Sequence, residues 1–287
     1  MLSQMTGFFT SAFYFAGTNW ESILVAIALG LVFGAVWLAF YRPPLFKKPW
    51  LWAVVAVSAI LTWTAIAFVQ IPLQYWYALA VGHFWNEAEI TRWIFLAGFV
   101  LVLLSGLVQE AAKLAPVLFY WWRSKQSFTP KFGLIVGAVS GAGFGVFEAI
   151  WVHNQIFAAG VSWPVVNNSI VGFWERIFAV AFHIAVSALA GYGLAKRKGW
   201  LFYLIAAFLH GVVNFSIILI EDNLLTQVQS ELYLTVIAVV LTAIVLWLRW
   251  HKEKEIPVDN PPAFTPVSTP DIPPAVTPDV IPQAPVS

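Results

Sequence analysis

Residues 133–150, GLIVGAVSGAGFGVFEAI, combine a glycine at every fourth position with a carboxylate in an otherwise apolar run. The four glycines share one face of a helix, where small residues let a neighbouring membrane helix approach closely. Glu148 follows the third of them by seven residues, about two helical turns, and therefore points in nearly the same direction. We expect a membrane helix whose glutamate faces a tight helix–helix contact, away from lipid. The glycines are Gly133, Gly137, Gly141 and Gly145.

The composition of the whole chain indicates that a lipid bilayer is its solvent. Of the 287 residues, 60% are hydrophobic and 10% are charged, and the mean hydropathy is +0.80. Soluble domains contain roughly 25% charged residues. The net charge of +1 gives no reason to expect a nucleic-acid partner. Because the chain has no cysteine, disulfides, thiolate metal sites and a cysteine nucleophile are excluded.

Seven apolar segments are long enough to cross a bilayer, which takes roughly 20 helical residues. The predicted fold is therefore all-α, a polytopic membrane bundle. Lysines and arginines follow the first, third, fifth and seventh segments, whereas the other connections are richer in acidic residues. The positive-inside rule then places the N-terminus outside and the C-terminus in the cytoplasm. We expect a multi-pass protein of a prokaryotic plasma membrane. The predicted spans are 20–41, 50–71, 93–122, 132–157, 171–195, 199–220 and 232–250.

Three other parts of the chain are not assigned to spans. Residues 1–19 are predicted to be an N-terminal outer segment preceding the bundle of residues 20–250. Residues 74–92 are predicted to be either an amphipathic helix on the outer surface or a loop packed over the bundle. Residues 251–287 are rich in proline and are predicted to form a disordered cytoplasmic tail. This tail is either a plain spacer or a ligand for a cytoplasmic partner that recognises proline.

Four of the spans contain polar side chains at membrane depth, where ionisable groups are expensive and face a cavity or each other. Glu110 and Lys113 are three residues apart and are able to pair, and His210 and Asn214 share one helix face. At about 1.5 Å per residue, three spans carry their ionisable group about 16–18 Å from the cytoplasmic helix end, and Glu148 lies about 24 Å from it. We therefore expect one cluster near mid-membrane, within residues 93–220. Its members are Gln109, Glu110, Lys113, Glu148, His183, His210 and Asn214.

All of these groups except Glu148, which has no evident partner in its own helix, also have an ordinary structural explanation. Glu110 with Lys113 alone would be a structural ion pair. A lone His183 would be a hydrogen bond between helices, and His210 with Asn214 would be an interhelical clamp. The cluster as a whole is better explained by chemistry, because all four spans carry such a group.

Other ionisable residues near the spans are assigned ordinary roles. Arg176 lies two turns before His183 on the same face but near the outer surface, where it is expected to anchor the helix. The remaining histidines are assigned to loops or the tail as solvated residues: His83, His153 and His251.

The ordered set of motifs resembles the CPBP/PrsW superfamily of intramembrane endopeptidases, which includes the CAAX prenyl endopeptidases, PrsW and the YhfC-like branch. The resemblance covers about residues 93–220. The glutamate that ends the second motif matches the PrsW branch, so a prenylated substrate is not inferred. The matching stretches are QEAAK at 109–113, FGVFE at 144–148, His183 in the next span, and HGVVN at 210–214.

The resemblance implies a helical bundle with a membrane-buried proteolytic site. Glu110 and Glu148, with His183, would activate water, and the histidine and asparagine of HGVVN would stabilise the oxyanion. Gln109 and Lys113 take supporting positions. One position departs from the family motif, because Gln109 stands where the first of two adjacent glutamates is expected. This departure keeps open a second interpretation, a non-catalytic membrane scaffold descended from a protease.

The residue types suit amide hydrolysis, since a carboxylate shielded from water is a competent general base. A metal-free mechanism, with no cofactor, is slightly favoured, because the chain lacks the HExxH pattern typical of zinc proteases. The alternative is a zinc ion held by Glu148, His183 and His210. A proton-coupled transporter is a third function class, although the helices lack the paired breaks that transporters show. The expected partners are the lipid bilayer and a membrane-protein or peptide substrate.

Overall fold

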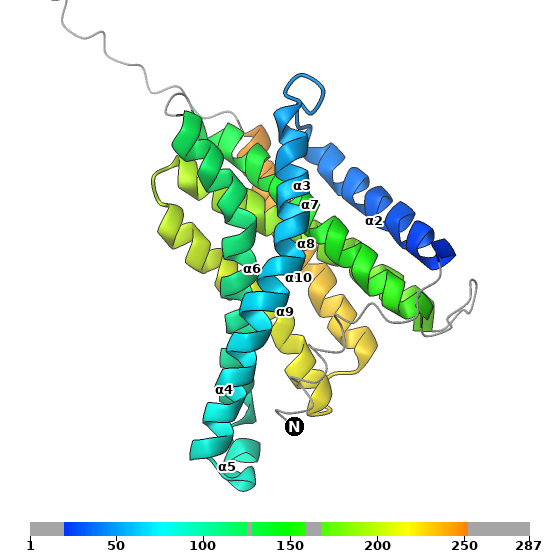
Figure 1. The fold of residues 1–287 in the computed structure, drawn as a ribbon, viewed down its shortest axis with the longest axis vertical. Helices are drawn as coiled ribbons and strands as arrows, with labels where there is room; N and C mark the ends of the chain where they lie inside the picture. Colours follow the sequence, from blue (N-terminus) through cyan, green and yellow to red (C-terminus); the bar gives the residue numbers. More distant parts are fainter. Residues whose placement is uncertain (1–19, 125–127, 159–167, 252–287) are drawn as a thin grey trace, which may run out of the picture. The chain divides into compact units, whose positions relative to one another are not determined.

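The computed structural model describes residues 20–124, 128–158 and 168–251 (Figure 1). The predicted segment 1–19 and the tail after His251 lie outside these residues. All regular elements in the described ranges are helical, and seven helical segments are long and apolar enough to cross a membrane. The predicted all-α polytopic fold is therefore confirmed. The elements are α2 (Trp20–Tyr41), α3 (Trp50–Ala65), η1 (Ile66–Gln70), α4 (Ile71–Phe84), α5 (Glu87–Arg92), α6 (Ile94–Ser124), α7 (Pro130–Ala158), α8 (Asn168–Ala195), α9 (Gly199–Glu221) and α10 (Gln227–Trp250).

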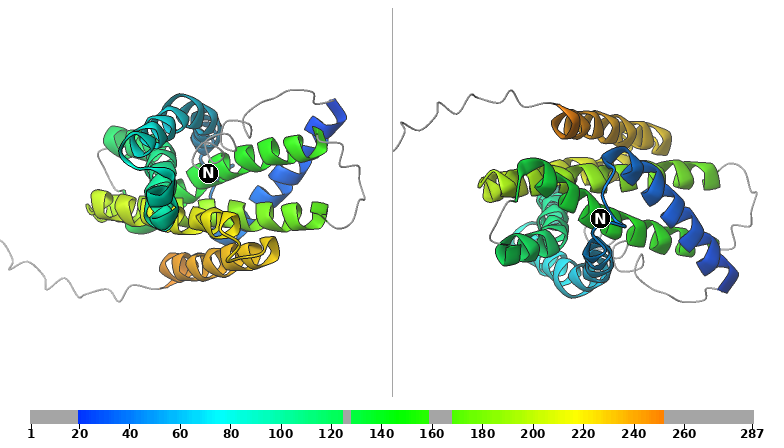
Figure 2. Two further views of the ribbon diagram at one scale, coloured as in Figure 1. Left: turned by 90° about the horizontal axis from the view of Figure 1, so that it is seen from below. Right: turned by 90° about the horizontal axis from the view of Figure 1, so that it is seen from above.

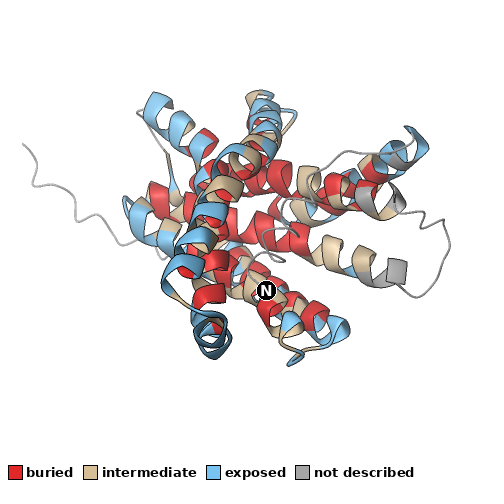
Figure 3. Cartoon of the chain, turned by 60° about the horizontal axis from the view of Figure 1, so that its bottom comes forward, coloured by how far each residue is buried: buried red, intermediate tan, exposed pale blue. Residues whose placement is uncertain are grey.

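Helices α7 and α8 form the centre of the bundle (Figure 2). In their most apolar windows, 78% of α7 and 83% of α8 are buried, against 22% of the first span and 33% of the last. Helices α2 and α3 pack on α7, whereas α9 and α10 pack on α8, and α6 packs mainly on α9. Buried residues accordingly gather on the inner helices (Figure 3). Polar groups on α7 and α8 are thus kept away from lipid.

The glycine ladder of α7 packs directly against the backbone of α8. A Cβ atom at Gly137 would collide with the Ser187 carbonyl, and one at Gly141 would collide with the His183 carbonyl. Gly133 faces Gly191 of α8 in the same way. The close approach expected from the glycine spacing is therefore present, and it fixes the position of His183 relative to α7.

The second span bends through a π-helical turn, η1, which Pro72 explains. Proline has no backbone N–H, and in a regular α-helix its ring would clash with the carbonyl four residues earlier, that of Phe68. The chain widens there instead, and the N–H of Ile71 bonds the carbonyl of Ile66, five residues back. Such π turns often occur at functional sites. This turn directs Gln70 into the bundle, where its side chain is only 1% exposed.

The segment 74–92 differs from both predicted forms. Residues up to Phe84 continue the helix of the second span, so that this span runs from Trp50 to Phe84. Only Glu87–Arg92 forms a separate short helix, α5, which begins with a reciprocal capping box between Asn86 and Glu89. The surface helix or loop predicted for residues 74–84 is therefore wrong, because the widened turn lets the helix pass Pro72 without ending.

Candidate active site

Helices α6, α7, α8 and α9 bring the predicted ionisable residues into one buried network. Glu110 lies at its centre, with 1% of the residue exposed. Its Oε1 atom accepts hydrogen bonds from Lys113 Nζ and from His210 Nδ1, the latter at 2.7 Å. Lys113 Nζ also lies 3.0 Å from His183 Nδ1. The expected Glu110–Lys113 ion pair is therefore present, and it links the two histidines.

Glu148 forms the other end of this network. Its Oε2 atom lies 2.8 Å from His183 Nε2 and 3.3 Å from Arg176 Nη1. Both partners belong to α8, the helix that the glycine ladder faces. This agrees with the prediction that Glu148 points in nearly the same direction as the glycines. About 18% of the Glu148 side chain stays exposed. Arg176, which the sequence assigned to a surface anchor, is instead 12% exposed and paired with this carboxylate.

The hydrogen bonds fix where the histidine protons lie. A lysine ammonium only donates, so His183 Nδ1 accepts from Lys113, and Nε2 carries the proton given to Glu148. A carboxylate only accepts, so His210 Nδ1 carries the proton given to Glu110. In its neutral form His210 therefore presents an unprotonated Nε2. It donates from Nε2 only when the ring carries both protons.

The two remaining residues of the predicted site are amides, and each has a hydrogen-bond partner that the sequence did not indicate. Asn214 donates from Nδ2 to Ser105 Oγ of α6 at 2.9 Å. Gln109 donates from Nε2 to Gln70 Oε1 at 3.0 Å. Both partners sit on spans where nothing in the motif spacing distinguishes them from other polar helix residues.

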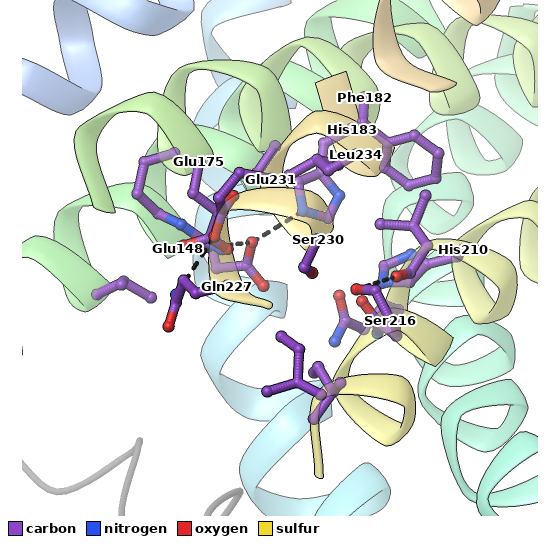
Figure 4. A pocket seen from close by; sticks show the side chains of 18 of the residues that line it. Glu148, Glu175, Phe182, His183, His210, Ser216, Gln227, Ser230, Glu231 and Leu234 are labelled. Atoms are coloured by element: carbon purple, nitrogen blue, oxygen red, sulfur yellow. Dashed lines mark hydrogen bonds and ion pairs between the residues drawn. The ribbon is translucent and has the colours of Figure 1, made fainter. Parts of the chain in front are cut away.

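A cavity of about 410 Å³ opens beside this network. Figure 4 shows Glu148 joined to His183 on one side of it, with His210 on the other side. Asn214 and Gln109 also line it, whereas Glu110 and Lys113 do not. Glu148 and His183 are therefore accessible from the cavity, whereas Glu110 is linked to it through its hydrogen bond with His210.

Three of these residues also form a group with the composition of a catalytic zinc site. One ligand atom from each of Glu110, His183 and His210 lies within 4.8 Å of the others. A carboxylate with two imidazoles is a common donor set for catalytic zinc. Glu110 Oε2 is buried and has no hydrogen-bond partner among the described residues, which leaves it free to bind a cation. The residues fit the metal, but the carboxylate in this group is Glu110, whereas the sequence proposed Glu148.

One histidine was placed wrongly. His153 lies within α7 and is fully buried, with Nδ1 2.7 Å from the Ala149 carbonyl and its ring stacked on Phe173. The prediction of a solvated loop residue is wrong, and it already disagreed with the predicted span 132–157, which α7 (Pro130–Ala158) matches closely. His83 and His251 are exposed, as expected, but His83 lies in the last turn of α4 and not in a loop.

Comparison with protein families matches residues 47–247 to the PrsW family intramembrane metalloproteases. No curated protein and no solved structure gave a match. The matched range includes five of the seven spanning segments completely, most of the last one, and every residue of the buried network. The chain is thus an integral, multi-pass membrane protein, and it belongs to the PrsW family of intramembrane metalloproteases.

Proposed function

We propose that this chain is an endopeptidase that hydrolyses a peptide bond of a membrane-embedded substrate in the cavity beside Glu148. The observation that carries the proposal is the Glu148–His183 pair, a carboxylate and an imidazole 2.8 Å apart on the wall of a cavity within the bundle. A volume of about 410 Å³ falls in the range of small-ligand sites and accommodates a few residues of an extended peptide.

In this proposal Glu148 takes a proton from a water molecule as the water oxygen bonds to the substrate carbonyl carbon. The proton then passes to the leaving nitrogen as the C–N bond breaks. His183 holds the Glu148 carboxylate through its Nε2–H, and Arg176 supports it from the same helix. Both positioning contacts come from α8, so the base is held by one rigid element.

The developing oxyanion is assigned to His210 and Asn214. Asn214 donates one amide hydrogen to Ser105, which leaves the second for a ligand in the cavity. His210 donates through Nε2 in its doubly protonated form, and the buried Glu110 carboxylate is the anion beside that charge. Donors placed in this way typically contribute roughly 3–4 kcal/mol to transition-state stabilisation.

Glu110, His183 and His210 would hold a zinc ion, which when bound supplies an activated water and polarises a carbonyl. Lys113 engages two of these three ligands, because its ammonium contacts Glu110 Oε1 and His183 Nδ1. A bound cation and this ammonium compete for the same atoms and repel each other.

Lys113→Met is therefore expected to tighten zinc binding by at least about tenfold, since it removes a neighbouring charge and frees His183 Nδ1. Competition with a chromophoric chelator, using purified protein in detergent, measures the change. Lys198→Met, at an exposed lysine, is the matched control. Adding His210→Ala to the variant should abolish the gain. Unchanged or weaker binding by Lys113→Met would show that zinc, if it binds, uses other residues.

The direct test of the proposed function is cleavage in liposomes of single-span peptides carrying a fluorophore and a quencher, with mass spectrometry to locate the cut. Cleavage within the apolar segment by the wild type supports the endopeptidase. Gln109 favours the alternative, a non-catalytic scaffold. That alternative predicts an inactive wild type and a Gln109→Glu variant that cleaves.

A further inference from the structure

Three glutamines form a hydrogen-bonded row beside the cavity. Gln74 Nε2 donates to the Leu101 carbonyl of α6 at 3.0 Å, and Gln70 Nε2 donates to Gln74 Oε1 at 3.3 Å. Gln109 Nε2 then donates to Gln70 Oε1 at 3.0 Å. The exposed fractions are 1% for Gln70 and Gln74 and 5% for Gln109. The row connects the helix after the π turn to the centre of α6.

The direction of the row is fixed at its far end. A backbone carbonyl only accepts, so the atom of Gln74 that faces Leu101 must be the amide nitrogen. Its oxygen must then face Gln70, and the oxygen of Gln70 must face Gln109. The three hydrogen bonds therefore all run in the direction of the Leu101 carbonyl, and the Oε1 atom of Gln109 ends the row as an acceptor.

This last acceptor has no donor within the described part of the chain. Gln109 Oε1 is buried, and none of the described residues donates a hydrogen bond to it. Gln70 and Gln109 both line the cavity with Glu148, His183 and His210. A buried acceptor without a partner costs free energy, because it has lost its hydrogen bond with water. Such a group in a native structure needs an explanation, which is a bound partner or a functional role. The oxygen cannot turn away without breaking the row. Since the Gln109 residue lines the cavity, a molecule bound there is the candidate source of the missing donor.

A substrate helix supplies such donors when it is opened for cleavage. In an apolar environment the backbone N–H groups of a spanning segment need acceptors, and unwinding releases them from their helical partners. We propose that Gln109 Oε1 accepts a hydrogen bond from a backbone N–H of the unwound substrate, close to the scissile bond. The inference rests on the proposed protease function and adds a substrate-positioning residue to it.

The row also accounts for the departure from the family motif. A glutamate at position 109 would place a carboxylate oxygen against Gln70 Oε1, two acceptors without a proton between them. The amide nitrogen of Gln109 instead donates to Gln70 Oε1, in the same way as Gln70 Nε2 donates to Gln74 Oε1. We therefore assign Gln109 to the substrate site and expect Gln109→Glu to lower cleavage.

The test uses liposomes and a single-span peptide that the wild type cleaves, with each backbone amide near the scissile bond replaced in turn by an ester. An ester lacks the N–H but keeps the chain geometry, and the scissile amide is left intact. One ester position is expected to lower the wild-type kcat/KM by about tenfold. Gln109→Leu should lower the rate on the all-amide peptide by a similar factor and show no further loss with that ester.

Gln70→Leu frees the Gln109 amide to turn, so the ester should then cause a smaller loss of kcat/KM, the ester penalty. Gln227→Leu, at another glutamine lining the cavity, should leave the ester penalty unchanged. An ester penalty that persists in Gln109→Leu would overturn the inference. So would the absence of any ester effect in the wild type, and both results leave the protease itself intact. Cleavage that requires Gln109→Glu would overturn the proposed function and this inference together.

Discussion

Glu148→Gln is expected to lower cleavage by about three orders of magnitude, within the range of 10²–10⁴ typical for loss of a general base. The amide keeps the size of the side chain and still accepts from His183 Nε2 and Arg176, so the packing of α7 on α8 should be preserved. Only the ability to take a proton from water is removed. The initial rate of peptide cleavage in liposomes, at saturating and limiting substrate, measures the loss and separates kcat from KM.

Glu231→Gln is the matched control for this variant. Glu231 lines the same cavity and is 7% exposed. Its carboxylate accepts a hydrogen bond from Gln227 of its own helix, and among the described network residues it interacts with Arg176 by charge alone. Its substitution is expected to change kcat by less than about threefold, because no proton transfer is assigned to it. Equal losses in both variants would mean that the cavity needs negative charge in general, and Glu148 would lose its role as the base.

The spanning helices and the membership of the cluster could be predicted because each depends on a local, periodic property of the sequence. Apolar length gives a spanning helix, and the spacing of glycines gives its contact face. The direction of Glu148 follows from that same face, since Gly141 and Glu148 are seven residues apart. These inferences need only the geometry of one helix, and the contact of Glu148 with α8 agrees with them.

The partners of each side chain could not be predicted, because they depend on how far neighbouring helices rotate and slide relative to one another. The group that could hold a metal ion contains Glu110, and not Glu148, together with both histidines. The estimated depths of the two glutamates in the membrane were too coarse to distinguish these possibilities. Gln70 reaches Gln109 only because the π turn at Pro72 changes the helix phase. Arg176 was judged by its distance from the helix end, although its spacing of seven from His183 already placed it on the site-facing side.

Gly141→Leu is expected to destabilise the protein by more than the roughly 3 kcal/mol that typical overpacking costs. The added side chain would collide with the carbonyl of His183 and with the Cα of Ile184, which are backbone atoms and cannot rotate away. Helices α7 and α8 would have to separate, which removes close packing along the most buried pair in the bundle. Reversible unfolding in mixed micelles containing SDS measures the change in the free energy of unfolding.

Gly82→Leu provides the matched control, because a Cβ there would meet no atom within 4 Å. Both glycines lie within helices, where helix propensity favours leucine. The control is expected to alter the free energy of unfolding by less than about 0.5 kcal/mol in the destabilising direction. Similar stability of the two variants would show that α7 and α8 do not need their close contact. Because that contact also sets the distance from Glu148 to His183, any Gly141→Leu protein that folds should have lost cleavage activity as well.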